Sequence, residues 1–219
     1  MSFRTWLLPM LAPAVLAWSV PAVSAEQDLS VNARLLLAAR NGDTAGVDRA
    51  LTAGASPNAR NRLGETALVV ALKRNDLAIA TTMLDAGANV NQAALNGVTP
   101  LMAAAYGGHT QMAALLLAKG ADVGALDQLK KNAMTYAAGE GHTDIVLMLI
   151  AKGVDPNAVY QNDLTALMWA AGFGRAGTVK ALLDAGARAE FKDNRGKTAL
   201  DMARDGGYTQ TVALLERSI

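Results

Sequence analysis

The chain has 219 residues and a formal net charge of +1; 52% of the residues are hydrophobic, 18% are charged and 5% are aromatic. It is too apolar and too weakly charged for a disordered protein, and its charge gives no electrostatic reason to expect binding to nucleic acid or to an anionic membrane surface. Because the sequence contains no cysteine, it excludes disulfides, thiolate metal sites, a cysteine nucleophile and lipid attachment to cysteine.

Residues 1–25 have the pattern of a secretory signal peptide. Arg4 precedes an apolar stretch over residues 6–20, and small residues follow up to Ala25. The alternative is an uncleaved membrane anchor, but Pro9 and Pro13 interrupt the apolar stretch and favour cleavage after Ala25. Cleavage removes one basic and no acidic residue, so the 20 basic residues become 19 against 19 acidic ones, and the mature chain is formally neutral.

The remainder of the sequence contains no apolar stretch long enough to span a bilayer, because Lys, Gly or Asp interrupts every candidate. The alanine-rich signal and the missing disulfide framework favour a bacterial source. We therefore expect a periplasmic protein that makes no membrane contact after signal cleavage. Secretion into the medium is the second choice.

Three series of residues recur every 33 residues after the signal. The first series is a set of helix-start triplets, at Thr66-Ala67-Leu68, Thr99-Pro100-Leu101, Asn132-Ala133-Met134, Thr165-Ala166-Leu167 and Thr198-Ala199-Leu200. The second is a set of glycines, Gly54, Gly87, Gly120, Gly153 and Gly186. The third is a set of apolar pairs, Met83-Leu84, Leu116-Leu117, Leu149-Ile150 and Leu182-Leu183. No insertion or deletion disturbs the register, so the architecture is a repeat array.

The sequence of each 33-residue unit predicts two short helices and a loop. The triplet's first residue is a suitable N-cap, and Pro100 fits the first helical position. Gly108 and Gly141 permit the left-handed turn that ends the first helix. Helices this short are marginal when isolated, so neighbouring units must stack in order to bury their apolar faces.

The sequence resembles the ankyrin repeat over about residues 30–219. The resemblance rests on the Thr-Pro-Leu triplet, the Gly-His and Leu-Leu pairs and the Gly-Ala-Asn-Val-Asn segment at 87–91, at a period of 33 residues. The resemblance implies an all-α solenoid of helix-turn-helix units with short β-hairpin loop tips. We expect a signal peptide over 1–25 and an ankyrin-repeat domain over 26–219. The expected repeats are 30–61 (N-terminal cap), 62–94, 95–127, 128–160, 161–193 and 194–219 (C-terminal cap).

The sequence departs from the family pattern at two kinds of position. The family's His after Thr-Pro-Leu is replaced throughout, so we expect its helix-bracing hydrogen bond to be missing; the replacements are Val69, Met102, Thr135, Met168 and Asp201. Lys130 and Asp163 stand where the loop tip usually has Gly. These two tips are expected to turn differently from the others.

The sequence predicts no catalytic residues, no cofactor and no metal ion. His109 and His142 are the only histidines, and their Gly-His positions favour hydrogen bonding at helix ends over metal ligation. Residues 172–177 match the letters G-x-G-x-x-G, but a dinucleotide fingerprint needs a preceding strand, and here an inner helix is expected. We therefore expect a protein without enzymatic activity.

Partners of ankyrin proteins usually bind the concave surface, which consists of the hairpin tips and the exposed ends of the inner helices. Here the three middle repeats place several apolar and aromatic residues on this surface, and the repeats on either side carry more charge there, which is typical of a binding hot spot. The candidate protein-binding residues are Leu95, Val98, Tyr106, Leu129, Tyr160, Leu164 and Phe173.

One alternative for these aromatic residues is that Tyr106 and Phe173 fold back over the bare helix at Gly107, Gly139 and Gly172. Two further aromatic residues, Tyr136 and Trp169, are expected to pack at the wall of the groove.

The resemblance implies a protein-protein interaction scaffold whose partner is a protein of unknown identity. No nucleic-acid partner is expected, and we expect a monomer. The alternative function is a secreted, effector-like ankyrin protein that binds a protein of another cell.

Overall fold

The computed structural model describes residues 29–218, so the predicted signal peptide lies outside the described range. Within that range the chain forms twelve α-helices and one short 3-10 helix, η1 (Gln161–Asp163). The α-helices follow one another in pairs: α2 (Val31–Asn41) with α3 (Thr44–Thr52), α4 (Ala67–Lys73) with α5 (Leu77–Asp85), α6 (Pro100–Gly107) with α7 (Thr110–Ala118), α8 (Ala133–Glu140) with α9 (Thr143–Ala151), α10 (Ala166–Gly172) with α11 (Ala176–Asp184), and α12 (Ala199–Asp205) with α13 (Thr209–Glu216).

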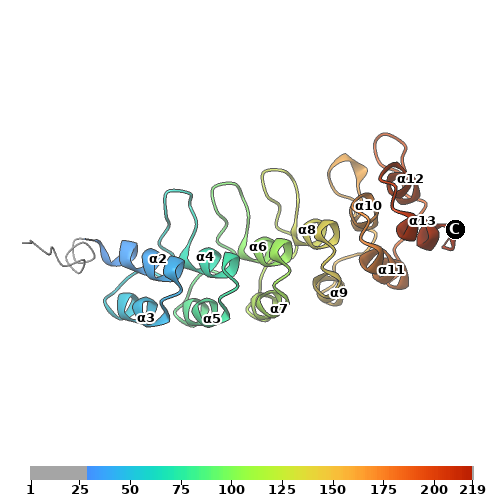
Figure 1. Ribbon diagram of the computed structural model, residues 1–219. Coiled ribbons are helices and arrows are strands. Elements are labelled where there is room, and N and C mark those ends of the chain that lie inside the picture. Colours follow the sequence, from blue (N-terminus) through green and yellow to red (C-terminus); the bar gives the residue numbers. More distant parts are fainter. Residues whose placement is uncertain (1–28, 219) are drawn as a thin grey trace, which may run out of the picture.

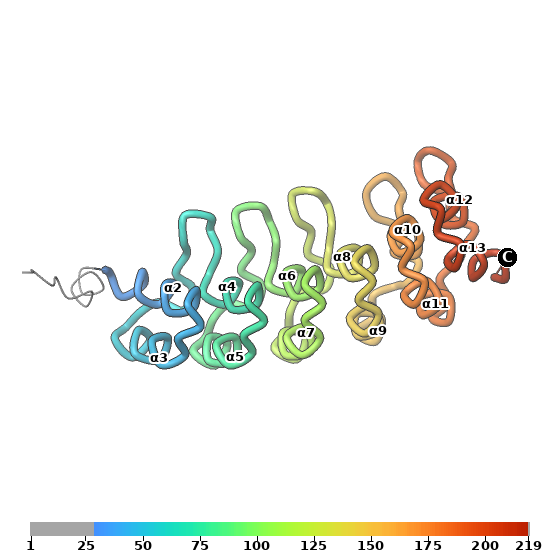
Figure 2. The backbone as a smooth tube through the Cα atoms, viewed as in Figure 1, coloured from blue at the N-terminus to red at the C-terminus, as the bar shows by residue number. Residues whose placement is uncertain are grey.

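The six pairs stack side by side into an elongated solenoid (Figure 1). The even-numbered inner helices form one row and the odd-numbered outer helices form a second row. Loops project from the side of the inner row, as the backbone trace shows (Figure 2). Among residues 29–218, no helix is both long and apolar enough to cross a membrane.

Each inner helix from α4 onward begins at the N-cap that the sequence predicts. The Thr66 and Thr165 side chains, for example, accept hydrogen bonds from the backbone N–H three residues later. The replaced family His is compensated in three repeats. Thr135 Oγ1 accepts from the Asn132 N–H at 3.0 Å, and an Asp201 carboxylate oxygen accepts from the Thr198 N–H at 3.0 Å. Met102 Sδ accepts from the Thr99 N–H at 3.4 Å. The expected loss of the helix-bracing bond is therefore wrong for these three repeats.

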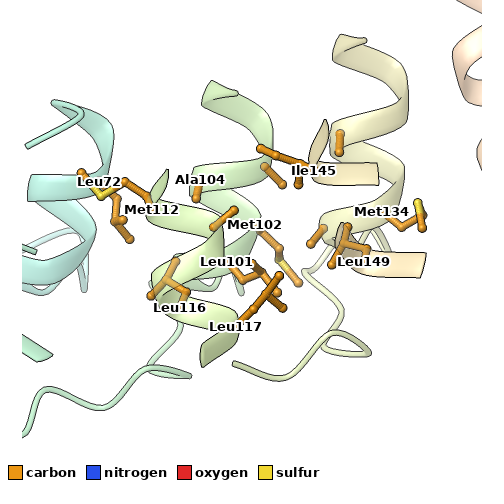
Figure 3. Close-up of a cluster of buried hydrophobic side chains, with 14 of the residues drawn as sticks. Leu72, Leu101, Met102, Ala104, Met112, Leu116, Leu117, Met134, Ile145 and Leu149 are labelled. Atoms are coloured by element: carbon orange, nitrogen blue, oxygen red, sulfur yellow. The ribbon is translucent and has the colours of Figure 1, made fainter. Parts of the chain in front are cut away.

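Apolar residues of the inner and outer helices form one continuous core along the solenoid. Figure 3 shows a central part of this core. Leucine or methionine at the third triplet position points into it, and the alanine three residues further on is fully buried, which lets neighbouring inner helices approach closely. The buried alanines are Ala71, Ala104, Ala137, Ala170 and Ala203. Full burial of one leucine contributes about 1.5–3 kcal/mol. Stacking therefore supplies the stability that each short helix lacks.

The connectors are the segments between one helix pair and the next, 53–66, 86–99, 119–132, 152–165 and 185–198. Each carries a tight hairpin closed by a backbone hydrogen bond, such as Ala94 N–H to Val98 O at 2.9 Å. Within residues 29–218 the hairpins contain only two isolated β-bridges and no strand.

The two loop tips that lack glycine differ from each other. Lys130 adopts a left-handed conformation with φ 57°, like the glycine at the same position in the previous loop, Gly97, with φ 82°. The expectation of a different turn is therefore wrong for Lys130. It is confirmed for Asp163, because Asn162 and Asp163 both have positive φ and the tip winds into η1.

Neighbouring connectors are joined by asparagine side chains. Asn58, Asn91 and Asn157 each accept a hydrogen bond from a backbone N–H of the next connector at 2.7–2.8 Å. Each side chain also donates to the backbone carbonyl of the glycine that recurs every 33 residues in the next connector, at 3.0–3.4 Å. Backbone bonds join the hairpin tips as well, for example Gln128 N–H to Asn96 O at 3.1 Å.

One junction has none of these bonds. Gly124 stands at the asparagine position, and the backbone N–H of Gln161 does not reach the carbonyl of Leu129. Among the described residues, neither a backbone hydrogen bond nor the pair of asparagine bonds joins the connectors 119–132 and 152–165, which we call the open junction. The pairs on either side are still held by helix packing between α8 and α10 and between α9 and α11.

Candidate functional site

The inner face of the solenoid is the surface formed by the hairpins and the adjoining sides of the inner helices. All seven predicted binding residues lie on it. Leu95, Tyr106, Leu129 and Phe173 are at least half exposed, with 65%, 59%, 64% and 50% of their surface accessible. Val98, Tyr160 and Leu164 are half-buried.

The first hollow of the inner face lies between the hairpins and helices α4, α6 and α8. Its volume is about 230 Å³. Val98 and Tyr106 line it together with Tyr136, Glu65 and Lys73. Two of the seven predicted residues therefore meet here.

The second hollow lies at the open junction and has a volume of about 250 Å³. Leu129, Tyr160 and Leu164 line it, so three more of the predicted residues come together. Trp169 forms its wall on α10. Leu95 and Phe173 line neither hollow.

Aromatic residues and one lysine separate the two hollows. The Tyr106 and Tyr136 rings meet edge-on with their centroids 5.8 Å apart, and Trp169 stacks on Phe173 at 6.0 Å. The Lys131 ammonium lies 4.5 Å from the Trp169 centroid and 5.5 Å from that of Tyr136. Such cation–π contacts contribute about 0.5–1 kcal/mol at exposed sites. Lys131 therefore links the aromatic pairs into one row.

Two tyrosine hydroxyls of this region, those of Tyr136 and Tyr160, have a raised pKa. The Tyr136 hydroxyl donates to an Asp127 carboxylate oxygen at 2.6 Å. Burial and this hydrogen bond raise the pKa of Tyr136 far above its ordinary value. Burial also raises the pKa of Tyr160. These two phenols therefore add no negative charge to the surface.

One ion pair lies near each end of the inner face. Lys73 donates to Glu65 on α4 and its hairpin, and Lys197 donates to Asp205 at the equivalent positions of the last repeat. Burial opposes the ionisation of Glu65, but hydrogen bonds from Lys73 and Asn61 outweigh it and hold the pKa below its usual value. At each end, one lysine and one carboxylate among the flanking charges are therefore paired with each other.

The structure adds three residues that the sequence reasoning did not place at the centre of the site: Lys131, Tyr136 and Trp169. The sequence did contain a signal for two of them, because Tyr136 and Trp169 occupy the same position, four residues after the N-cap, in adjacent repeats.

The alternative in which aromatic side chains fold back over bare helix describes part of the arrangement. Trp169 and Phe173 lean over Gly139, where an added Cβ would lie 3.6 and 3.7 Å from their rings, yet half of Phe173 remains exposed.

The remaining chemical candidates are structural. The His142 Nε2–H donates to the Tyr106 carbonyl at 3.1 Å, as expected for a histidine at a helix end. Burial, and the proximity of His142, lower the pKa of His109. Residues 172–177 span the last residue of α10, the turn 173–175 and the first residues of α11, so a helix and not a strand precedes the turn. Within residues 29–218, no group of three or more His, Asp or Glu side chains is placed to hold a metal ion.

Comparison with known proteins identifies the family. A model of ankyrin repeats (three copies) matches residues 35–127, 82–160 and 134–218, which together run without a gap from 35 to 218. The chain therefore belongs to the ankyrin-repeat family. Ankyrin repeats generally mediate protein–protein interaction, and members of the family are typically non-enzymatic scaffolds.

Solved ankyrin structures are similar over most of the chain. The ankyrin repeat protein EF0377 is 32% identical, with a TM-score of 0.76, over 85% of this chain and 98% of that chain. The ankyrin repeat domain of human ASB11 is 26% identical, with a TM-score of 0.77, over 84% of this chain and 82% of that chain. No curated protein matches the sequence. The all-α ankyrin solenoid predicted from the sequence is thus confirmed.

Proposed function

We propose that this protein is a non-enzymatic scaffold of the bacterial periplasm that binds a partner protein through the inner face of its central repeats. The observation that carries the proposal is the row of aromatic side chains beside the two hollows, with the exposed Tyr106 and Phe173 at its ends and the half-buried Tyr136 and Trp169 between them. The exposed surface of the Tyr106 and Phe173 rings is available to a partner, and aromatic side chains of this kind dominate the energetics of protein interfaces.

The binding surface is tested by the double substitution Tyr106→Ala with Phe173→Ala. Cross-linking in intact cells with the tagged full chain, followed by mass spectrometry, defines the partner of the wild type. We expect the double variant to recover at least about tenfold less of it, since two hot-spot rings are lost. The thermal melt should stay nearly unchanged because both side chains are largely exposed.

The matched control is Leu77→Ala with Leu147→Ala, which removes exposed apolar side chains from the outer helices α5 and α9 instead. We expect this variant to recover the partner as the wild type does. Undiminished recovery by the Tyr106 and Phe173 variant, or equal loss by the control, would show that the inner face is not the binding surface.

The location follows from the signal pattern of residues 1–25 and is tested separately. We expect the mature protein in osmotic-shock fluid, with Glu26 as its N-terminal residue by mass spectrometry. Recovery from the culture supernatant would instead support the secreted, effector-like alternative. An intact N-terminus in the membrane fraction would contradict cleavage.

A further inference from the structure

The open junction leaves two backbone groups unbonded beside the second hollow. At other junctions the equivalent groups bond across the hairpin tips, at 3.1–3.3 Å. Here the Leu129 carbonyl and the Gln161 N–H have no hydrogen-bond partner within residues 29–218, and both residues line the hollow. Free backbone groups next to an apolar surface are what an extended peptide needs for main-chain pairing.

The lining of the second hollow is positively charged. Lys130 and Lys131 both line it, and no aspartate or glutamate does. The ion pairs among the described residues include neither lysine. The Lys131 ammonium is instead held over the Trp169 and Tyr136 rings, which fixes its position. A carboxylate is the complementary group, because it forms charge-assisted hydrogen bonds with an ammonium.

The size of the hollow indicates what enters it. Its volume of about 250 Å³ lies below the usual range of about 300–1,000 Å³ for small-molecule pockets. Leu129, Leu164 and Trp169 supply an apolar lining. The hollow therefore suits one large apolar side chain of a longer chain better than a complete small ligand.

Resting on the proposed function, we propose that the second hollow binds an extended acidic segment of the partner protein. A large apolar side chain of that segment fills the hollow, and a neighbouring Asp or Glu pairs with Lys131. The backbone of the segment donates to the Leu129 carbonyl and accepts from the Gln161 N–H. Only the open junction offers this arrangement, because the hairpin tips are bonded to each other at the other junctions of the described chain.

The probe for this site is a phage-displayed library of random 12-residue peptides, selected on the purified mature protein. We expect the selected peptides to carry Asp or Glu within two residues of a large apolar residue. A synthetic peptide of the selected sequence should bind at least about tenfold more weakly to Lys131→Met and to Leu129→Ser, and its affinity should fall with salt. The bound peptide should also slow hydrogen exchange of the Gln161 amide.

The matched control is Leu63→Ser. Leu63 and Leu129 occupy equivalent positions in their hairpins and are 65% and 64% exposed, but the Leu63 carbonyl is bonded to Leu95. Peptide affinity should therefore be unchanged in this variant. Enrichment of basic peptides, no enrichment at all, or equal affinity of all variants would overturn the proposal.

The two proposals fail in different ways. If the partner protein is lost with Tyr106→Ala and Phe173→Ala but retained with Lys131→Met and Leu129→Ser, the scaffold function stands and the acidic-segment site is wrong. If all of these variants retain the partner, the inner face itself is not the binding surface.

Discussion

Single residues in this solenoid take over roles that the repeat pattern assigns to other residue types. Thr135 and Asp201 replace the family histidine and still accept a hydrogen bond from the backbone N–H of the N-cap residue of their helices. Lys130 replaces a tip glycine and takes up its left-handed conformation. In the first case the replacement side chain keeps a hydrogen bond, whereas in the second the backbone carries strain that glycine would avoid.

The strain at Lys130 predicts that Lys130→Gly stabilises the protein. A left-handed conformation costs a non-glycine residue about 1–2 kcal/mol, and the greater freedom of glycine in the unfolded chain offsets about 0.4–1 kcal/mol of the gain. We expect the free energy of unfolding, measured by urea denaturation, to rise by about 0.5–1 kcal/mol. Lys152→Gly is the control, because φ is −87° there and no strain is relieved. A rise in both variants would contradict this explanation.

At the scale of the structural element, the connectors are held together by one asparagine per junction. This side chain makes two hydrogen bonds to the next connector, and it is missing where Gly124 stands. The space for it is available, since an added Cβ at Gly124 meets only an Asp122 carboxylate oxygen at 3.4 Å, and φ there is not positive. The two absent side-chain bonds therefore follow from one residue type, whereas the absent backbone bond between the hairpin tips does not.

This arrangement predicts that Gly124→Asn restores the bonds to the Gly153 carbonyl and the Asp155 N–H. Each hydrogen bond contributes about 0.5–1.5 kcal/mol, so the free energy of unfolding should rise by about 1–2 kcal/mol. The reciprocal change, Asn91→Gly, should lower it by a similar amount. The free energy of unfolding of both variants is measured by denaturant unfolding. If Gly124→Asn leaves it unchanged, helix packing and not the missing asparagine keeps the junction open.

At the scale of the whole molecule, stability is a sum of units and their contacts with nearest neighbours. Inner-helix packing continues through the open junction, but connector bonding stops there. The solenoid thus has a local weakness in its connector layer and an unbroken helical core. The separation of the loops before α8 and α10 is visible in Figure 1.

This weakness predicts uneven hydrogen exchange at equivalent positions. The Asn89, Asp122 and Arg188 amides are each bonded to an asparagine side chain, whereas the Asp155 amide has no partner within residues 29–218. Asp155 should therefore exchange at least about tenfold faster than the other three under native conditions. Hydrogen exchange followed by NMR measures this, and Gly124→Asn should bring Asp155 close to the others. Equal rates in the wild type would contradict the description of the junction.

The sequence by itself determined the repeat, its period and the pairing of helices. These follow from local rules, because N-caps, left-handed glycines and apolar periodicity each act within a few residues. It also placed the seven candidate residues on one face, since a strict 33-residue register puts equivalent positions side by side.

The tertiary structure alone decided how those residues divide into two hollows, that Lys131 lies between Tyr136 and Trp169, and that one junction is open. These features depend on side-chain directions and on contacts between residues about 30 positions apart. The absence of an asparagine at position 124 was readable in the sequence, but its consequence was not. A missing side chain leaves a gap only if the neighbouring connectors do not close over it, and the packing of whole repeats determines whether they do.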